Sequence, residues 1–293
     1  MSAAVHHEWR EAAGVRLHCA VAGEGERLML FLHGFPEFWG AWRALLEHFG
    51  ARGWRAVAPD LRGYNLSDKP PEVDAYKAKH LTADVLALAA HYTRGRFFLV
   101  GHDWGGAVAW NVAIGHPARL ERLVVINSPH PYVFWRELTR NPAQCKASEY
   151  MNLFRLPKAE RVLSENGYAR LLSAFEHLPQ AWRAKLVEAW SRPGALTGGL
   201  NYYRASPMHP PTPEHPGAAK LALEPKDFVV RVPTLVLWGE RDTALLTGCL
   251  EGLEECVPDL KVVRMPQASH WIVHEEPQRV IREIEAFAGT AQA

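Results

Sequence analysis

Short apolar runs alternate with helical patterns over the first part of the chain. The runs are rich in branched and aromatic residues and show little alternation of polar and apolar positions, which is typical of parallel strands covered on both faces. They comprise residues 28–32, 56–58, 97–100 and 123–126. Helical patterns lie between them at residues 38–49, 80–92 and 105–116. This order predicts a parallel sheet with helices on both sides.

The strand pattern is interrupted between about residues 129 and 226. Helical patterns occupy this stretch at residues 150–172, 180–190 and 198–205, and a proline-dense loop follows at 207–216. Strand-like runs return at residues 234–238 and 261–264, before a last helix at 277–287. We therefore expect an α/β core in two parts, residues 1–129 and 227–293, with a helical cap inserted at residues 130–226.

The composition is that of an ordinary globular protein, with 48% hydrophobic and 22% charged residues and a formal net charge of +1. This balance gives no reason to expect nucleic acid or an anionic membrane as a partner. The N-terminal residues lack the apolar segment of a signal peptide, and no run of about 18 apolar residues occurs, so we expect a cytoplasmic protein without a membrane span. The 4 cysteines are scattered and no metal or nucleotide motif is present, so we expect no cofactor and no metal. Both a monomer and a homodimer are compatible with the sequence.

The most informative residue is Asp103, in the segment Gly101-His102-Asp103-Trp104-Gly105. The segment lies between an expected buried strand and an expected helix, which is the setting of a nucleophile elbow. Glycines suit so sharp a turn because a Cβ would clash there. Where most enzymes of this pattern carry serine, this chain has a carboxylate, which attacks without a base and forms an ester to carbon. Asp103 therefore favours displacement at an sp³ carbon, as in an epoxide or an alkyl halide.

Two further residues complete a possible catalytic set. Asp242 follows the strand run that ends at residue 238, and His270 follows the run that ends near residue 264. Each therefore lies beyond the carboxyl end of an expected parallel strand, where open α/β sheets place their sites. The order of nucleophile, acid and histidine predicts His270 as a general base oriented by Asp242. Taken singly, Asp103 could cap the following helix, Asp242 could be a turn residue and His270 could be structural.

The segment His33-Gly34-Phe35-Pro36 follows the strand run that ends at residue 32. A nucleophile elbow needs backbone N–H donors to stabilise developing negative charge, and those of Phe35 and Trp104 are the expected oxyanion hole. Pro36 is compatible with a cis Phe35–Pro36 peptide bond. The alternative is an ordinary proline turn.

Taken together, these motifs resemble those of the α/β-hydrolase-fold epoxide hydrolases. The matching segments are His33-Gly34-Phe35-Pro36, Asp60-Leu61-Arg62-Gly63-Tyr64 and Gly101-His102-Asp103-Trp104-Gly105-Gly106. The resemblance covers nearly the whole chain. It implies an α/β-hydrolase fold, with a mostly parallel central sheet flanked by helices and an inserted helical cap.

The resemblance also implies two cap tyrosines that bind the oxirane oxygen. Tyr150 stands seven residues before Pro157, and Tyr203 lies in the run Asn201-Tyr202-Tyr203-Arg204, and both positions fit the family pattern. Phenol O–H groups can stabilise and protonate the leaving alkoxide. Packing within the cap is the alternative role for both rings. Because Tyr202 and Tyr203 are adjacent on one helix, we expect only Tyr203 to face the cavity.

We expect the substrate to be contacted by apolar and aromatic side chains near these motifs, each of which could equally fill the core. They are Phe35, Pro36, Trp39, Trp104, Met151, Phe154 and Trp271. The expected partners are a small-molecule epoxide and water, and the expected product is a vicinal diol formed through an aspartyl ester.

Three alternative functions remain open from the sequence. A haloalkane or haloacetate dehalogenase would use the same aspartate, although the Phe35 side chain has no donor for a halide. An ester or lactone hydrolase would have to form an unfavourable anhydride on Asp103. A non-catalytic binding protein on the same fold is the third alternative.

Overall fold

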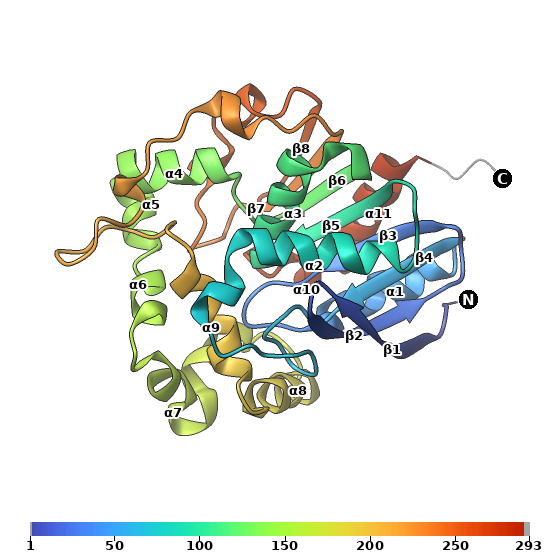
Figure 1. Ribbon diagram of the computed structural model, residues 1–293, viewed down its shortest axis with the longest axis horizontal. Coiled ribbons are helices and arrows are strands. Elements are labelled where there is room, and N and C mark those ends of the chain that lie inside the picture. Colours follow the sequence, from blue (N-terminus) through green and yellow to red (C-terminus); the bar gives the residue numbers. More distant parts are fainter. Residues whose placement is uncertain (1, 290–293) are drawn as a thin grey trace.

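Within residues 2–289, the part of the chain that the computed structural model describes, eight strands form one mixed sheet (Figure 1). The strands are β1 Val5–Ala12, β2 Val15–Ala22, β3 Arg27–Leu32, β4 Trp54–Pro59, β5 Phe97–His102, β6 Leu120–Ile126, β7 Thr234–Gly239 and β8 Leu260–Met265. Their order in the sheet is β1-β2-β4-β3-β5-β6-β7-β8. From β4 to β8 all neighbouring strands pair in parallel, so the predicted mostly parallel sheet is confirmed.

The hairpin of β1 and β2 was not predicted by the hydrophobic pattern. The two strands pair in antiparallel fashion, and β2 joins the sheet through an antiparallel pairing with β4. β1 is an edge strand whose side chains are mostly polar and exposed, so it contains no apolar run. The turn between the strands places Ala13 and Gly14 at positive φ, of 47° and 86°, as two-residue hairpin turns require.

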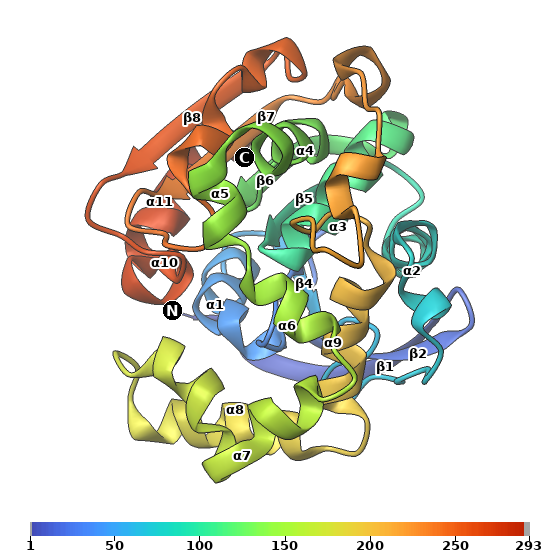
Figure 2. The same ribbon diagram turned by 90° about the vertical axis from the view of Figure 1, so that its left-hand side faces the viewer.

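Helices cover both faces of the sheet (Figures 1 and 2). On one face, α2 Ala78–Ala90 contacts α3 Trp104–Gly115, and α3 lies against β5 and β6. On the other face, α1 Arg43–Gly50 contacts β4 and α11 Pro277–Ala288, which follows the short α10 Ile272–Glu275. The central strands are therefore buried on both sides, and every residue of β5 and β7 is buried. This explains why their sequences show no alternation.

A helical segment connects β6 to β7, and no strand occurs in it. Its helices are α4 Pro131–Arg140, α5 Pro142–Ala147, α6 Tyr150–Arg155, α7 Ala159–Leu172, α8 Gln180–Ser191 and α9 Ala195–Ala205. The expected helix at residues 150–172 is divided into α6 and α7 at Pro157, and α7 is kinked between Glu165 and Tyr168. α4 and α5 were not predicted. Figure 1 shows α6 to α9 gathered in the lower left part of the view. The bounds of a cap at residues 130–226 stay a prediction.

Short 3-10 helices complete the described elements, at Trp39–Trp42, Val73–Tyr76, Pro117–Arg119, Ser173–Phe175, Gly217–Lys220, Pro225–Phe228, Thr247–Leu250 and Leu253–Glu255. Within residues 2–289, no helix combines the length and apolar character that crossing a bilayer requires.

Candidate active site

The turn between β5 and α3 holds Asp103 in a strained backbone conformation. Its φ of 50° and ψ of −120° lie in a region that non-glycine residues rarely adopt, and such residues cost on the order of 1–3 kcal/mol each. Neighbouring groups fix the turn, because Ser128 Oγ donates to the Asp103 carbonyl at 2.7 Å and the Ala107 N–H donates to it at 2.9 Å. The Asp103 side chain makes no capping hydrogen bond to α3. The carboxylate is therefore left for other contacts.

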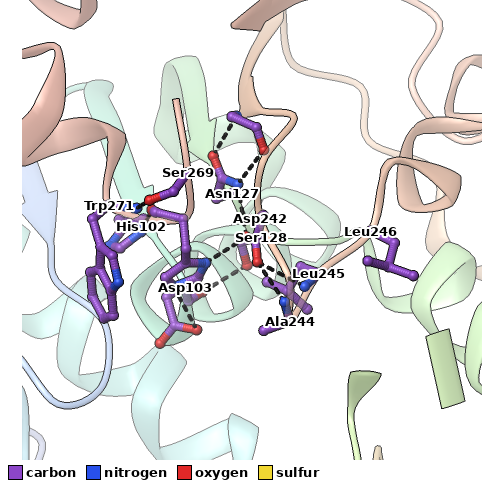
Figure 3. Close-up of polar contacts among 12 residues, drawn as sticks. His102, Asp103, Asn127, Ser128, Asp242, Ala244, Leu245, Leu246, Ser269 and Trp271 are labelled. Atoms are coloured by element: carbon purple, nitrogen blue, oxygen red, sulfur yellow. Dashed lines mark hydrogen bonds and ion pairs between the residues drawn. The ribbon is translucent and has the colours of Figure 1, made fainter. Parts of the chain in front are cut away.

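Asp103, Asp242 and His270 come together beyond the carboxyl ends of β5, β7 and β8. Figure 3 shows Asp103 and Asp242 in this position. His270 Nδ1 lies 2.6 Å from Asp242 Oδ2, and His270 Nε2 lies 3.7 Å from Asp103 Oδ2. The Nδ1–H group can therefore donate to Asp242, which directs Nε2 toward Asp103. The longer gap leaves Nε2 close to Asp103 without a direct hydrogen bond.

Three donors other than His270 surround the Asp242 carboxylate. Asp242 Oδ1 accepts from the backbone N–H groups of Ala244 and Leu245 at 2.8 and 2.9 Å, and Oδ2 accepts from Asn127 Nδ2 at 2.8 Å (Figure 3). Burial raises the pKa of Asp242, but His270 and these donors outweigh burial and hold the pKa below its ordinary value. Asp242 is therefore an ionised carboxylate with a fixed orientation.

The same charges act on His270. Burial lowers the pKa of His270, but Asp242 first, and then Asp103 and Glu37, outweigh burial and raise the pKa to about 9. The resting site at neutral pH therefore holds an imidazolium between two carboxylates.

The loop after β3 supplies a donor to the Asp103 carboxylate. The backbone N–H of Phe35 donates to Asp103 Oδ1 at 2.8 Å. This close approach requires glycine at position 34, because a Cβ there would collide with the Asp103 side chain. The Phe35–Pro36 peptide bond is cis, one of the two forms that the sequence left open. Trp104, the other expected oxyanion donor, is the first residue of α3, and its N–H makes no hydrogen bond to Asp103 among the described contacts.

A cavity of about 830 Å³ extends from Asp103 into the helical segment. Trp104, Tyr150, Met151 and Tyr203 line it together with Asp103. Much of the remaining wall comes from apolar residues that sequence reasoning did not identify, among them Leu81, Val108, Phe134, Met208, Phe228 and Leu245. Asp103 is the sole carboxylate in the lining that the structure describes.

The two expected tyrosines lie next to each other in this cavity, with ring centroids 6.2 Å apart. Tyr150 begins α6 and Tyr203 lies near the end of α9. Burial, and after it the Asp103 carboxylate, raises the pKa of Tyr150 well above its ordinary value, and burial followed by Tyr150 and Asp103 does the same for Tyr203. Both phenols are therefore protonated donors at neutral pH. Tyr202 also reaches the lining, but its hydroxyl donates to the Arg62 carbonyl at 2.9 Å.

Several expected substrate contacts are not part of the cavity lining. Phe35 and Phe154 pack edge-to-face against Tyr203 at centroid distances of 5.3 and 5.0 Å, and so support that ring. Trp271 packs against His270 at 4.8 Å.

The expectation that Pro36 and Trp39 contact the substrate is corrected, because neither residue lines the cavity and both contact other groups. The Pro36 carbonyl accepts from the Trp190 indole N–H at 2.5 Å. The Trp39 ring contacts the His7 ring, with centroids 4.9 Å apart, and its backbone N–H donates to Asp60.

A group of buried titratable residues behind His270 was not predicted. Glu37 contacts His274 Nε2 directly, and its Oε2 lies 3.6 Å from His102 Nδ1. His102 Nε2 in turn lies 3.0 Å from the His270 carbonyl. Burial raises the pKa of Glu37, but His274 and His102 outweigh it and lower the pKa well below its ordinary value. Asn127 and Ser128 were also missed, although they directly follow β6 and so obey the rule that identified Asp242.

Comparison with known proteins places the chain in a family. A family model described as alpha/beta hydrolase fold matches residues 27–277. The AB hydrolase superfamily protein YfhM of Bacillus subtilis is 39% identical over 90% of this chain and 91% of its own length, and mouse epoxide hydrolase 4 is 35% identical over 94% and 77%. The crystal structure of an epoxide hydrolase from Bacillus megaterium, solved with an inhibitor, superposes with a TM-score of 0.88 at 33% identity and covers 96% of this chain and 99% of that one. The chain therefore has the α/β-hydrolase fold and belongs to the epoxide hydrolase family.

Proposed function

We propose that this protein hydrolyses an epoxide to a vicinal diol through an ester on Asp103. The observation that carries the proposal is that the Asp103 carboxylate and the hydroxyl-bearing rings of Tyr150 and Tyr203 line one largely apolar cavity. A carboxylate suits attack on carbon, and two phenols suit protonation of the departing oxygen. The family relationship supports the same reaction class.

In the first half-reaction, an Asp103 carboxylate oxygen attacks one oxirane carbon and the C–O bond to the oxirane oxygen breaks. Tyr150 or Tyr203 gives its proton to that oxygen, while the other phenol donates a hydrogen bond to it. The products are a hydroxyalkyl ester on Asp103 and one tyrosinate. Two donors converging on one developing charge supply the stabilisation that an alkoxide leaving group needs.

In the second half-reaction, His270 first gives the proton of its resting imidazolium to the tyrosinate through water. The neutral His270 then takes a proton from a second water molecule, which attacks the Asp103 ester carbonyl. The oxyanion develops at the position of the Asp103 carboxylate oxygen, toward which the Phe35 N–H already points at 2.8 Å. The Trp104 N–H is the proposed second donor. Collapse of the oxyanion, with transfer of its hydroxyl proton to the departing alkoxide, releases the diol, regenerates the carboxylate and leaves His270 as the imidazolium of the resting site.

The electrostatics of the site support this sequence of steps. Only a neutral imidazole can accept a proton, yet the pKa of His270 is about 9 in the resting site. Asp103 is one of the groups that raises this pKa, and esterification removes its charge. Alkylation therefore shifts His270 toward the neutral form at the stage when a base is needed.

The test is turnover of styrene oxide by the wild type and by the Tyr150→Phe/Tyr203→Phe double variant, with 1,2-dibromoethane assayed in parallel. Diol formation by the wild type that is lost in the double variant supports the proposal. Bromide release without diol would assign the Asp103 chemistry to dehalogenation. Absence of both products, together with unchanged styrene oxide binding in Asp103→Asn, would favour a binding protein.

A further inference from the structure

Arg155, the last residue of α6, holds the carboxyl end of α9. Its Nη1 group donates to the carbonyl of Tyr203, to that of Ser206 at 2.8 Å and to that of Arg204 at 3.3 Å. Figure 2 shows α6 and α9 side by side, and the two helices are in contact along the helical segment. Arg155, which belongs to the same helix as Tyr150, therefore donates a hydrogen bond directly to the backbone of Tyr203.

The sequence explains why these carbonyls need an outside donor. α9 ends at Ala205, and the Tyr203 carbonyl would ordinarily accept from the N–H of residue 207, which is a proline and has none. The Arg204 carbonyl would accept from Met208, whose N–H instead donates to Ser206 Oγ. The guanidinium of Arg155 satisfies both groups and places a positive charge at the negative end of the helix dipole.

Arg155 also lines the cavity, and its side-chain hydrogen bonds within the described part of the chain all go to the end of α9. Among residues 2–289, its contacts include no carboxylate, and burial alone lowers its pKa. By contrast, the nearby Arg204 forms a two-point ion pair with Glu160 of α7 at 2.7 and 2.8 Å. The Arg155 cation is committed to the end of α9 rather than to a counter-ion.

Phe154 and Arg155 together fix the positions of the two phenol rings. Phe154, the residue before Arg155, packs edge-to-face against both tyrosines, with ring centroids 5.3 Å from Tyr150 and 5.0 Å from Tyr203. Its packing sets the ring orientations, whereas the Arg155 contact sets the position of the Tyr203 backbone relative to α6.

We propose that Arg155 is a positioning residue that holds the Tyr203 backbone against the Tyr150 helix, so that both phenols reach the same epoxide oxygen. This inference rests on the proposed function. Because both phenols act when the epoxide opens and neither acts as base in ester hydrolysis, Arg155 serves the first half-reaction only.

The test separates the two half-reactions. Enzyme in excess over styrene oxide is quenched at successive times, the covalent ester is measured by intact-protein mass spectrometry, and diol release is followed in the same samples. Arg155→Met removes the donors at similar length, and we expect the alkylation constant to fall by about 10-fold or more, since small displacements of catalytic groups have effects of this size. The constant for ester hydrolysis stays within about 2-fold of the wild type, because His270 and Asp242 are untouched.

Arg155→Lys should recover much of the loss, because an ammonium has three N–H groups and can reach several carbonyls. Arg192→Met is the matched control, since the Arg192 side chain also bridges within the protein, to Asn65 at 2.9 Å and Glu188 at 2.8 Å. Its link to α9 is made by its backbone carbonyl, which accepts from the Ala195 N–H and is kept in the variant. Arg192→Met should leave the alkylation constant unchanged. In a Tyr203→Phe background, Arg155→Met should add little further loss, because its effect passes through the missing hydroxyl.

Four outcomes overturn the inference. Equal losses in both half-reactions would mean that Arg155 has a general structural role, as would a full additional loss in the Tyr203→Phe background. An alkylation constant unchanged by Arg155→Met, in a wild type that forms the ester, would refute the positioning role alone. A wild type that forms no ester would refute the proposed function and remove the basis for the role of Arg155.

Discussion

Replacing Asp242 with asparagine should remove a pH-dependent part of the protein's stability. Asp242 Oδ2 lies 2.6 Å from His270 Nδ1, and it is the main group that raises the pKa of His270 against the opposing effect of burial. Asparagine keeps nearly the same shape and can still accept from the N–H groups of Ala244 and Leu245. The substitution therefore removes the charge with little change in volume.

The size of the effect follows from the His270 pKa. A rise from 6.5 in the unfolded chain to about 9 in the folded protein corresponds to about 3 kcal/mol of preference for the imidazolium. Because the folded pKa is raised, this stability is fully present below about pH 6.5 and is lost as the pH rises through about 9. Asp242 itself adds no pH dependence to the stability in this window, since its own pKa is lowered and it stays ionised.

The assay is urea-induced unfolding of the wild type and Asp242→Asn at about pH 6, 8 and 10. The quantity compared is the free energy of unfolding of the wild type minus that of the variant. This difference should be larger by up to about 3 kcal/mol at the lowest pH than at the highest. His274, whose pKa is also raised, titrates in both proteins, so its contribution cancels in the difference. A difference that is the same at all three pH values would refute the idea that Asp242 holds His270 in its charged form.

Three further substitutions test separate parts of the site. Tyr150→Phe alone should slow ester formation by on the order of 10–100-fold and leave ester hydrolysis unchanged, because one of two donors remains. Rapid-quench mass spectrometry measures both steps, and an equal loss in both would contradict this prediction. Ser128→Ala removes the 2.7 Å hydrogen bond to the Asp103 carbonyl and should lower the free energy of unfolding by about 1 kcal/mol, measured by urea denaturation; a stability unchanged from the wild type would show that this bond does not support the turn. Gly34→Ala should abolish ester formation while the protein stays folded by circular dichroism, because the added Cβ meets the Asp103 side chain; near-normal activity would show that the loop moves aside freely.

The parallel part of the sheet was predictable because burial on both faces leaves continuous apolar runs in the sequence. Once those runs are located, the residues that follow them mark the edge of the sheet where Asp103, Asp242 and His270 meet. The β1–β2 hairpin was not predictable in this way, because β1 is an exposed edge strand with few apolar positions. Its signal was instead the two-residue turn at Ala13 and Gly14.

Side-chain direction explains what sequence reasoning missed at the site. Trp39 follows the His33-Gly34-Phe35-Pro36 segment, but a short 3-10 helix turns it toward His7 and away from the cavity. Glu37, His102 and His274 come from three distant segments, and only the folded chain brings them together. Arg155 has no motif, and its contact with Tyr203 depends on the meeting of two helix ends.

The most direct test of the covalent account is a single turnover in ¹⁸O-labelled water. Wild-type enzyme in excess is mixed with styrene oxide, and both the diol and the peptide that contains Asp103 are examined by mass spectrometry. We predict an unlabelled first diol and one ¹⁸O atom in the Asp103 carboxylate, because water attacks the ester carbonyl and the diol takes its new oxygen from Asp103. Label in the first diol, with none in Asp103, would mean that water opens the epoxide directly and would contradict the account.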